Sequence, residues 1–208
     1  MHFNRPLFIV LEGIDGSGKT TQARLLESRL SKENRPVHRT FEPTDNKIGR
    51  TIRAIIRQED KVHPETLAAL FVADRLDHIL DESYGMKAQL AQGKHVISDR
   101  YYFSSYAYHS TDMPMDWVIA ANSLCADLLK PDIIFFIDVD PALSMQRIAN
   151  EREQTDLFET KSQLEKIRAN YMEAFEKKKD DEHIVIIDGN QSEDQIHEEI
   201  FAILSAMK

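Results

Sequence analysis

The chain has 208 residues, of which 42% are hydrophobic and 29% are charged, and its formal net charge at pH 7 is −9. This length is enough for one full hydrophobic core, so we expect a single domain over residues 1–208. The negative net charge argues against general binding to nucleic acid or to an anionic membrane, because both favour a basic face.

The sequence carries no sign of export or of membrane insertion. Its N-terminus lacks the apolar core of a signal peptide, and no apolar run approaches the ~20 residues that cross a bilayer. Cys125 is the only cysteine, and its apolar helical surroundings suggest a reduced, buried thiol. We therefore expect a soluble cytoplasmic protein.

The first predicted elements enclose a phosphate-binding motif. Apolar residues at 8–11 predict a strand buried on both faces, and a helical pattern begins at Lys19. Between them lies Gly13-x-x-x-x-Gly18-Lys19-Thr20, the spacing of a phosphate-binding loop. Such a loop directs backbone N–H groups at an anion, and the following helix adds its N-terminal dipole.

Two side chains of this loop support the prediction. Lys19 can reach the β- and γ-phosphates, and the Thr20 hydroxyl can bind Mg²⁺. The alternative, a glycine-rich turn that only caps a helix, is disfavoured by the strand–loop–helix context. The sequence therefore predicts a nucleoside triphosphate site.

Strand-like and helix-like segments alternate along the rest of the chain. Further strands are predicted at residues 37–41, 95–98, 133–137 and 184–187. Helices are predicted around 50–57, from 64 to about 92 with a break at Gly85 left open, at 117–129, after Asp140-Pro141, at 161–179 and at the C-terminus. A Ser- and Tyr-rich turn is expected at 103–110. The alternation favours an α/β fold in which a five-stranded parallel sheet is flanked by helices.

Glycine or a charged residue follows every predicted strand, at Gly13, Glu42, Asp99, Asp138 and Gly189. Because open parallel sheets bind ligands at the carboxyl ends of their strands, we expect these positions to face one crevice. The highly charged segment from 150 to 158 is either a mobile surface segment or a lid that closes over the crevice.

Two pairs of residues point to a second phosphate and to a base. Asp99 could hold a metal ion and Arg100 could clamp a phosphate, although a surface ion pair is the alternative. Phe71 and Arg75 share a helix face, so the ring could stack on a base whose polar edge the guanidinium reaches. An aromatic at this spacing is alone more often plain core. We assign no catalytic or zinc role to the histidines, which include His78, His95 and His109.

With these residues identified, the chain resembles the thymidylate kinases, a family of phosphate-loop nucleoside monophosphate kinases. The resemblance covers nearly the whole chain. It rests on residues 8–22 with their Glu-Gly-Ile-Asp sequence, on Glu42-Pro43, on Phe71 with Arg75, on Asp99-Arg100-Tyr101 and the residues up to 108, and on Asp188-Gly189. Together these motifs are specific, whereas none of them is specific alone.

The resemblance implies transfer of the γ-phosphate of ATP to dTMP, giving ADP and dTDP for dTTP biosynthesis, with Mg²⁺ and in a homodimer. It implies a phosphate-loop kinase fold with a short lid at about 148–160. The family pattern gives four catalytic residues, which are Lys19, Asp15, Arg100 and Arg152, and two metal ligands, Thr20 and Asp99.

The same pattern implies the binding residues. ATP would be bound by Gly13, Ile14, Asp15, Gly16, Ser17, Gly18, Lys19, Thr20, Thr21, Arg147, Gly189 and Asn190. dTMP would be bound by Asp15, Glu42, Pro43, Arg53, Phe71, Arg75, Arg100, Ser104, Ser105 and Tyr108. Phe71 would stack on thymine, Arg75 would bond O4, Ser105 would lie near N3, and Tyr108 would crowd the 2′ position.

Two positions depart from the family pattern. Some members carry arginine after the aspartate of the loop, where this chain has Gly16, so the lid residue Arg152 is the expected replacement. Many bacterial members have arginine where this chain has Phe41, and Arg50 could supply the missing contact to the acceptor.

Three alternatives remain to be weighed. One is a kinase for another nucleotide or for a deoxynucleoside. A deoxynucleoside kinase would need a base near the 5′-hydroxyl, for which the carboxylate of Glu42 is the candidate. A GTP-dependent switch would need Asp-x-x-Gly and Asn-Lys-x-Asp motifs, which the chain lacks, since Asn46-Lys47 is followed by Ile48-Gly49. A purely structural nucleotide-binding protein would not need the second set of residues around Phe71 and Arg100.

Overall fold

The computed structural model describes residues 5–151 and 160–207. Within them lie five strands: β1 (Phe8–Glu12), β2 (Val37–Phe41), β3 (His95–Asp99), β4 (Ile133–Asp138) and β5 (Ile184–Asp188). All neighbours in the sheet run parallel, in the order β2-β3-β1-β4-β5. The predicted α/β fold with a five-stranded parallel sheet flanked by helices is therefore confirmed.

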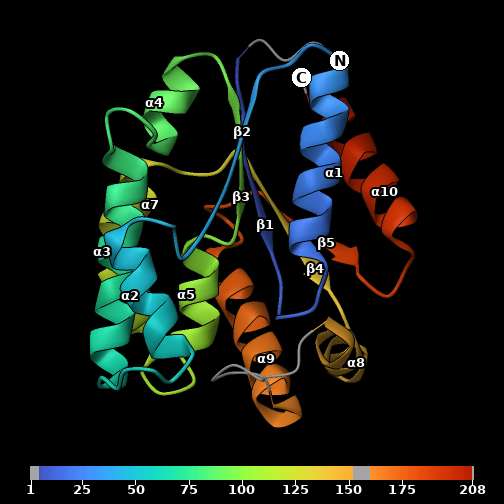
Figure 1. Cartoon of the computed structure of the whole chain (residues 1–208). Coiled ribbons are helices and arrows are strands. Elements are labelled where there is room, and N and C mark those ends of the chain that lie inside the picture. The colour runs from blue at the N-terminus through green and yellow to red at the C-terminus, as the bar shows by residue number, and fades with distance from the viewer. Residues whose placement is uncertain (1–4, 152–159, 208) are drawn as a thin grey trace.

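Helices lie on both faces of this sheet (Figure 1). The described helices are α1 (Lys19–Lys32), α2 (Lys47–Ile56), α3 (Pro64–Leu80), α4 (Met86–Ala91), α5 (Tyr102–His109), α6 (Met115–Ala121), α7 (Ser123–Leu128), α8 (Pro141–Glu151), α9 (Lys161–Lys178) and α10 (Glu193–Ala206). Figure 1 shows α1 and α10 on one face, and α3, α4 and α5 on the other.

Alternation along the strands builds two hydrophobic cores. In β1, Phe8 and Val10 point into the core shared with α5 and α9, while Ile9 and Leu11 point into the core shared with α1 and α10. Every residue of β1 is buried, which explains its uninterrupted apolar run. This rigid layer holds the ends of β1 and β3 at fixed positions beneath the loops that follow them.

The structure corrects the predicted helix from residue 64 to about 92. It is two helices, α3 and α4, because the Asp81 carboxylate accepts hydrogen bonds from the backbone N–H groups of Ser83 and Tyr84 at 2.8 and 2.9 Å. These bonds form a turn that competes with helix continuation. Gly85 is the N-cap of α4. The predicted helix at 117–129 is likewise split, at Asn122, into α6 and α7.

The predicted turn at 103–110 was wrong, because residues 102–109 form α5. All eight residues of α5 are buried. A helix surrounded by protein shows no polar face, so its sequence lacks the periodicity by which an amphipathic helix is recognised. α5 packs against α9, and its polar Ser and Tyr side chains find partners in the interior.

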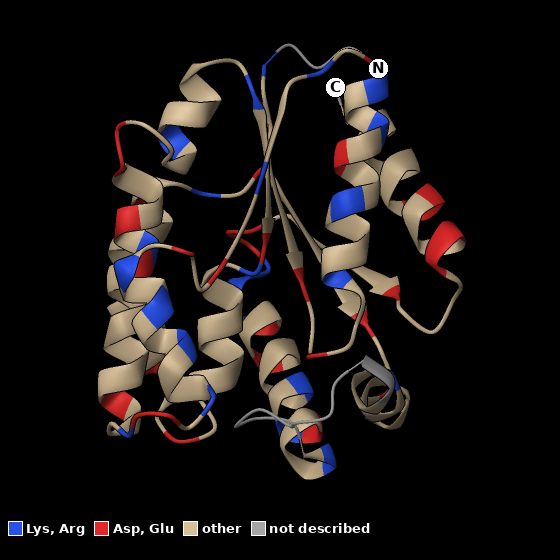
Figure 2. Ribbon diagram, viewed as in Figure 1, with Lys and Arg blue, Asp and Glu red and all other residues tan. Residues whose placement is uncertain are grey.

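Acidic and basic positions are interspersed along the helices in Figure 2. Among the described residues, none of the helices is long and apolar enough to cross a membrane.

Candidate active site

The phosphate-binding loop joins β1 to α1. Gly18, the N-cap of α1, has φ +93°, a left-handed conformation that glycine adopts without strain. A Cβ at Gly13 would lie 2.9 Å from the backbone carbonyl oxygen of Ile137, so this position also requires glycine. The first turn of α1 contains no acidic residue and no side-chain cap, which leaves its backbone N–H groups available to an anion.

Lys19 lies folded back over this loop. Its Nζ donates to Ile14 O at 2.8 Å and to Ser17 Oγ at 3.2 Å, and the residue is 6% exposed. Burial, and then the positive charge of Arg100, lower the pKa of the Lys19 ammonium to about 8. The negative charges of three nearby carboxylates act in the opposite direction and raise this pKa; they belong to Asp99, Asp15 and Glu12.

A large pocket extends over the loop, and we call it the donor pocket because the resemblance implies that ATP binds there. Its wall runs from residues 15–22 to Asp99 and Arg100, then to Arg147 and the start of α10. Thr20 Oγ1 donates to Asp99 Oδ2 at 2.5 Å, so these two oxygen ligands predicted for a metal lie together. Both are hard oxygen donors, the type that binds Mg²⁺.

The far wall of the donor pocket differs in part from the prediction. Arg147 lines the pocket and donates to Gly189 O at 3.2 Å, which agrees with their expected proximity. The lining residues beside it are Gln191, Ser192 and Glu193 rather than Gly189 and Asn190. The Asn190 side chain instead accepts from Asp140 N at 3.1 Å. The capping box of Ser192 and Gln195 was the sequence signal that could have located this wall.

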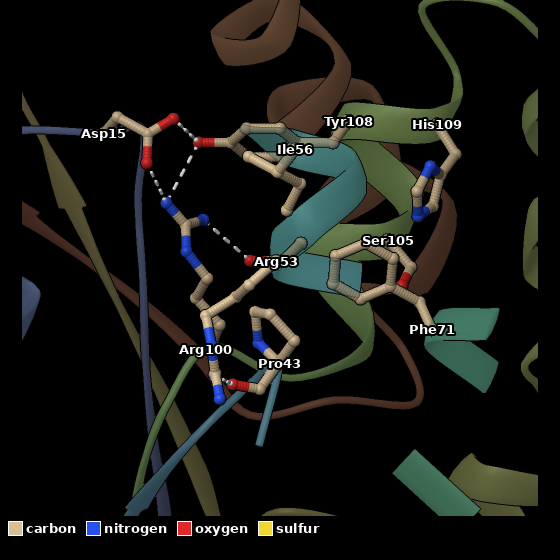
Figure 3. Close-up of a pocket in the computed structure, with 10 residues that line it drawn as sticks. Asp15, Pro43, Arg53, Ile56, Phe71, Arg100, Ser105, Tyr108 and His109 are labelled. Carbon is tan, nitrogen blue, oxygen red and sulfur yellow. Dashed lines mark hydrogen bonds and ion pairs between the residues drawn. The ribbon is translucent and has the colours of Figure 1, made fainter. Parts of the chain in front are cut away.

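Figure 3 shows a second pocket, which we call the acceptor pocket after the role that the resemblance implies. It shares lining residues with the first pocket. It is lined by Asp15, Pro43, Arg53, Ile56, Phe71, Arg100, Ser104, Ser105, Tyr108 and His109. Its residues come from the loops after β1, β2 and β3 and from α2, α3 and α5, which are far apart in the sequence. The ring of Phe71 forms part of its wall, as a base-stacking residue would, and packs on His109 with ring centroids 5.0 Å apart.

Arg53 contributes positive charge to the acceptor pocket. It donates to Pro43 O at 2.6 Å and to Asp45 Oδ1 at 2.5 Å. Arg50, considered as a replacement for the arginine missing at Phe41, donates to Asp45 O instead and is not part of the pocket wall. Arg53 is therefore the arginine of α2 that faces the pocket.

The two pockets meet at Asp15 and Arg100, which line both. Arg100 Nη2 donates to Asp15 Oδ1 at 2.6 Å and to Tyr108 OH at 3.0 Å, and Tyr108 OH donates to Asp15 Oδ2 at 2.8 Å (Figure 3). Arg100 Nη1 donates to Ser104 Oγ at 3.0 Å. The pKa of the Arg100 guanidinium lies well above its ordinary value, because Tyr108 and Asp15 outweigh the opposing effect of burial.

Arg75 and Glu42 lie behind the wall of the acceptor pocket. Arg75 is 1% exposed, and its Nε and Nη2 lie 2.8 and 2.7 Å from Glu42 Oε2. Its Nη1 donates to Ser105 Oγ at 3.1 Å, so Arg75 reaches the pocket through Ser105. Glu42 also contacts His78 Nδ1 at 3.1 Å. Phe71 and Arg75 thus share one side of α3, as predicted, but at different depths.

His109 is a pocket residue that the sequence did not single out. It is 4% exposed, and burial, together with the charge of Arg75, lowers its pKa to about 3. The imidazole is therefore neutral at physiological pH and forms one end of the acceptor pocket. The only sequence signal for a place in the pocket was that His109 directly follows Tyr108 in the chain. Arg152 and most of the expected lid lie outside the described residues.

A parallel sheet with a phosphate-binding loop at its carboxyl edge, and an acceptor pocket beside that loop, defines the phosphate-loop nucleoside monophosphate kinase class. A family model described as thymidylate kinase matches residues 11–200. The chain belongs to the thymidylate kinase family.

Individual relatives match along almost their whole length. A protein named thymidylate kinase from Leptospira borgpetersenii serovar Hardjo-bovis (strain L550) is 32% identical over 203 residues, covering 98% of this chain and 95% of the relative. Probable thymidylate kinases from Pyrococcus horikoshii and Methanocaldococcus jannaschii are each 36% identical, over 206 and 199 residues. These matches cover 96% of both chains in the first case and 95% of both in the second.

Proposed function

We propose that this protein transfers the γ-phosphoryl group of ATP to dTMP, forming ADP and dTDP for dTTP biosynthesis. The observation that carries this proposal is the junction of two pockets at Asp15 and Arg100. One pocket contains the phosphate-binding loop, and the other has an aromatic wall and two arginines. A hydrolase or a switch would need only the first of these pockets.

Residues of the donor pocket bind ATP in this proposal. The loop from Gly13 to Thr21 holds the phosphates through its backbone N–H groups, and the Lys19 ammonium contacts the β- and γ-phosphates. Arg147 lies against adenine, with the chain at 189–193 opposite it. Lys19 exchanges its contacts with Ile14 O and Ser17 Oγ for phosphate oxygens when ATP enters.

Residues of the acceptor pocket bind dTMP. Phe71 stacks on thymine and Ser105 bonds its N3 edge. Arg75, held by Glu42, supports this edge from behind through its bond to Ser105 Oγ. Arg53 and Arg100 bind the 5′-phosphate, with Pro43 and Ser104 beside it. Tyr108 limits the space at the 2′ position, and Asp15 lies near the 3′-hydroxyl.

The chemistry needs alignment and charge neutralisation rather than a general base. A phosphate oxygen of dTMP is already anionic at neutral pH, so it can attack the γ-phosphorus without losing a proton. Arg100 spans the two pockets and can contact both the attacking and the transferred phosphate. Lys19 and Arg100 together stabilise the negative charge that spreads over the transferred group.

The paired oxygens of Thr20 and Asp99 fit a divalent cation, which we propose to be Mg²⁺. When bound, this ion neutralises charge on the β- and γ-phosphates. Among the described residues there is no cluster of three or more His, Cys, Asp or Glu side chains that could hold a metal.

The main rival is a deoxynucleoside kinase that uses Glu42 as a base. The contacts of Glu42 argue against this role, because both carboxylate oxygens are already bonded, to Arg75 and to His78, and Glu42 does not line the acceptor pocket. Phosphorylation of another nucleoside monophosphate remains an outcome of the substrate panel described below.

We also propose that the chain is a single domain whose segment at about 148–160 closes over the site, with Arg152 reaching the transferred phosphate.

We further propose a homodimer. Three helices that contact one another each expose a large apolar side chain, as an interface would require. These side chains are Leu80 on α3, Trp117 on α6 and Leu124 on α7, which are 51, 44 and 54% exposed. Nucleotide substrates and a free Cys125 fit a cytoplasmic location.

Transfer of label tests the proposed reaction. ATP labelled at the γ-phosphate is incubated with the protein, Mg²⁺ and dTMP, and the products are separated. We expect the label in dTDP, in equal amount to the ADP formed. Label in inorganic phosphate alone would contradict the proposal.

A further inference from the structure

Glu12 is a buried carboxylate with four hydrogen bonds, and the mechanism above assigns it no part. It is the last residue of β1, directly before the phosphate-binding loop, and its exposure is 0%. Its Oε1 accepts from the backbone N–H groups of Tyr101 and Ser104 at 2.9 and 3.2 Å. Its Oε2 accepts from Ser104 Oγ at 2.6 Å and from Tyr171 OH at 2.9 Å.

Two of these bonds complete the N-terminus of α5. Tyr101 is the N-cap of α5, and its own side chain makes no capping bond. Glu12 Oε1 binds the N–H of this cap and the N–H of Ser104, which lies in the first turn. A side chain from a different strand thus does the work of an N-cap residue, and its negative charge suits the positive end of the helix dipole.

α5 and the residue before its cap form much of the acceptor pocket. Ser105, Tyr108 and His109 line it from α5, and Arg100 lines it from the turn that leads into the helix. Arg100 has φ +72°, a left-handed conformation that costs energy for a residue other than glycine. The bond from Glu12 to Tyr101 N–H holds the peptide that follows this strained residue.

Glu12 is also linked to the Arg100 guanidinium by two hydrogen bonds that meet at Ser104 Oγ. Arg100 Nη1 donates to Ser104 Oγ at 3.0 Å, and Ser104 Oγ donates to Glu12 Oε2 at 2.6 Å. Tyr171, from α9, binds the same carboxylate oxygen and packs against Tyr108 with ring centroids 6.4 Å apart. The backbone and the guanidinium of Arg100 are therefore both tied to one carboxylate.

We infer that Glu12 is a positioning residue that couples the phosphate-binding loop to the acceptor pocket, by capping α5 and holding Arg100 in its strained conformation. Glu12 touches no substrate in this arrangement. Because it lies at the end of β1, the position of α5 follows that of the strand from which the loop begins. The inference rests on the proposed function, since it takes the pocket along α5 to be the dTMP site.

Two substitutions separate the length of the side chain from its charge. Glu12→Asp keeps the charge but is one methylene too short to reach both backbone N–H groups. Glu12→Gln keeps the length: its carbonyl can accept the two N–H groups, while the Ser104 and Tyr171 hydroxyls can turn to accept from its amide. Ile200→Ala, in α10 on the opposite face of the sheet, is the matched control for lost stability.

Steady-state kinetics with each substrate varied, together with melting temperatures, tests the inference. For Glu12→Asp we expect the KM for dTMP to rise roughly tenfold, with a lower kcat, because loss of a helix cap shifts equilibria by about that factor. The KM for ATP stays near its original value, since the contacts within the loop do not involve Glu12. Glu12→Gln restores most of the dTMP affinity, and Ile200→Ala changes only the melting temperature.

Three results would overturn the inference. The first is a Glu12→Asp variant with a lowered melting temperature but an unchanged KM for dTMP. The second is an equal rise in the KM values for dTMP and ATP, and the third is a KM for dTMP in Glu12→Gln that is as high as in Glu12→Asp. If Glu12→Asp does not fold, Tyr171→Phe takes its place. We expect a smaller rise in the KM for dTMP in this variant, and an unchanged KM would contradict the inference. Failure of the proposed function is distinguishable, because the unsubstituted protein would then not phosphorylate dTMP.

Discussion

Arg100 Nη2 donates to Asp15 Oδ1 at 2.6 Å, and these are the two residues that line both the donor and the acceptor pocket. Asp15 belongs to the phosphate-binding loop, whereas Arg100 follows β3, and the parallel pairing of β1 with β3 brings them together. The carboxylate orients the guanidinium before substrates enter. In the proposed function, this arrangement directs the acceptor phosphate and the γ-phosphate to one place, which is what phosphoryl transfer requires.

Removing the Phe71 ring tests the base site. We expect Phe71→Ala to raise the KM for dTMP by roughly 10- to 100-fold, because stacking of a base on an aromatic ring is worth about 1–3 kcal/mol. The KM for ATP should not change. Ile79→Ala, a fully buried position on the same helix, is the control: it lowers the melting temperature but leaves the KM for dTMP unchanged. A Phe71 variant that behaves like this control would assign the ring to the core.

The lowered pKa of Lys19 predicts how ATP binding depends on pH. In the free protein this pKa is about 8, and phosphate contacts raise it in the complex. Below pH 8 the ammonium is already protonated and no proton needs to be taken up. Above pH 8 binding must add a proton, so the KM for ATP should rise towards tenfold per pH unit. Initial rates from pH 6.5 to 9.5 measure this, and a KM for ATP that is constant above pH 8 would contradict it.

The Arg75–Glu42 pair predicts a large effect on stability. Glu42→Ala leaves a buried guanidinium without its carboxylate partner, which costs about 3–5 kcal/mol in other proteins. The double variant Glu42→Leu with Arg75→Met removes both charges and should unfold at a higher urea concentration than Glu42→Ala. If Glu42→Ala is as stable as the unsubstituted protein, the Arg75–Glu42 pair does not stabilise the fold behind Ser105.

Arg152 is predicted from the sequence to act on the transferred phosphate. We expect Arg152→Ala to lower kcat by roughly 10³-fold, by analogy with arginine fingers, with little change in the KM for dTMP. Arg152→Lys keeps the charge but loses the planar fork, so it should restore only part of the rate. An unchanged kcat in Arg152→Ala would remove this residue from the mechanism.

Features encoded by neighbouring residues were predictable from the sequence. The five strands and the phosphate-binding loop were predicted correctly because buried β-branched runs and glycine spacing are local patterns. α5 was missed because it is buried on all sides and so shows no polar period. Glu12 and His109 became recognisable only through contacts with residues far away in the chain, which no local pattern reveals.

How deeply a side chain is buried could not be predicted from the sequence either. Phe71 and Arg75 were predicted to share a helix face, and they do. The partner of Arg75, however, is Glu42, which lies 33 residues earlier in the chain. Asp74, next to Arg75, accepts hydrogen bonds from Thr44 N–H and Thr44 Oγ1 at 2.8 and 2.6 Å, which ties the loop after β2 to α3. Such contacts are decided by tertiary packing.

An acceptor panel tests the central claim most directly. ADP release is measured with ATP and Mg²⁺ against dTMP, dUMP, dCMP, UMP, AMP and thymidine, each at the same concentration. The proposed function predicts fast turnover of dTMP, slower turnover of dUMP and none of thymidine. Preference for thymidine, or ATP hydrolysis that no acceptor accelerates, would contradict it.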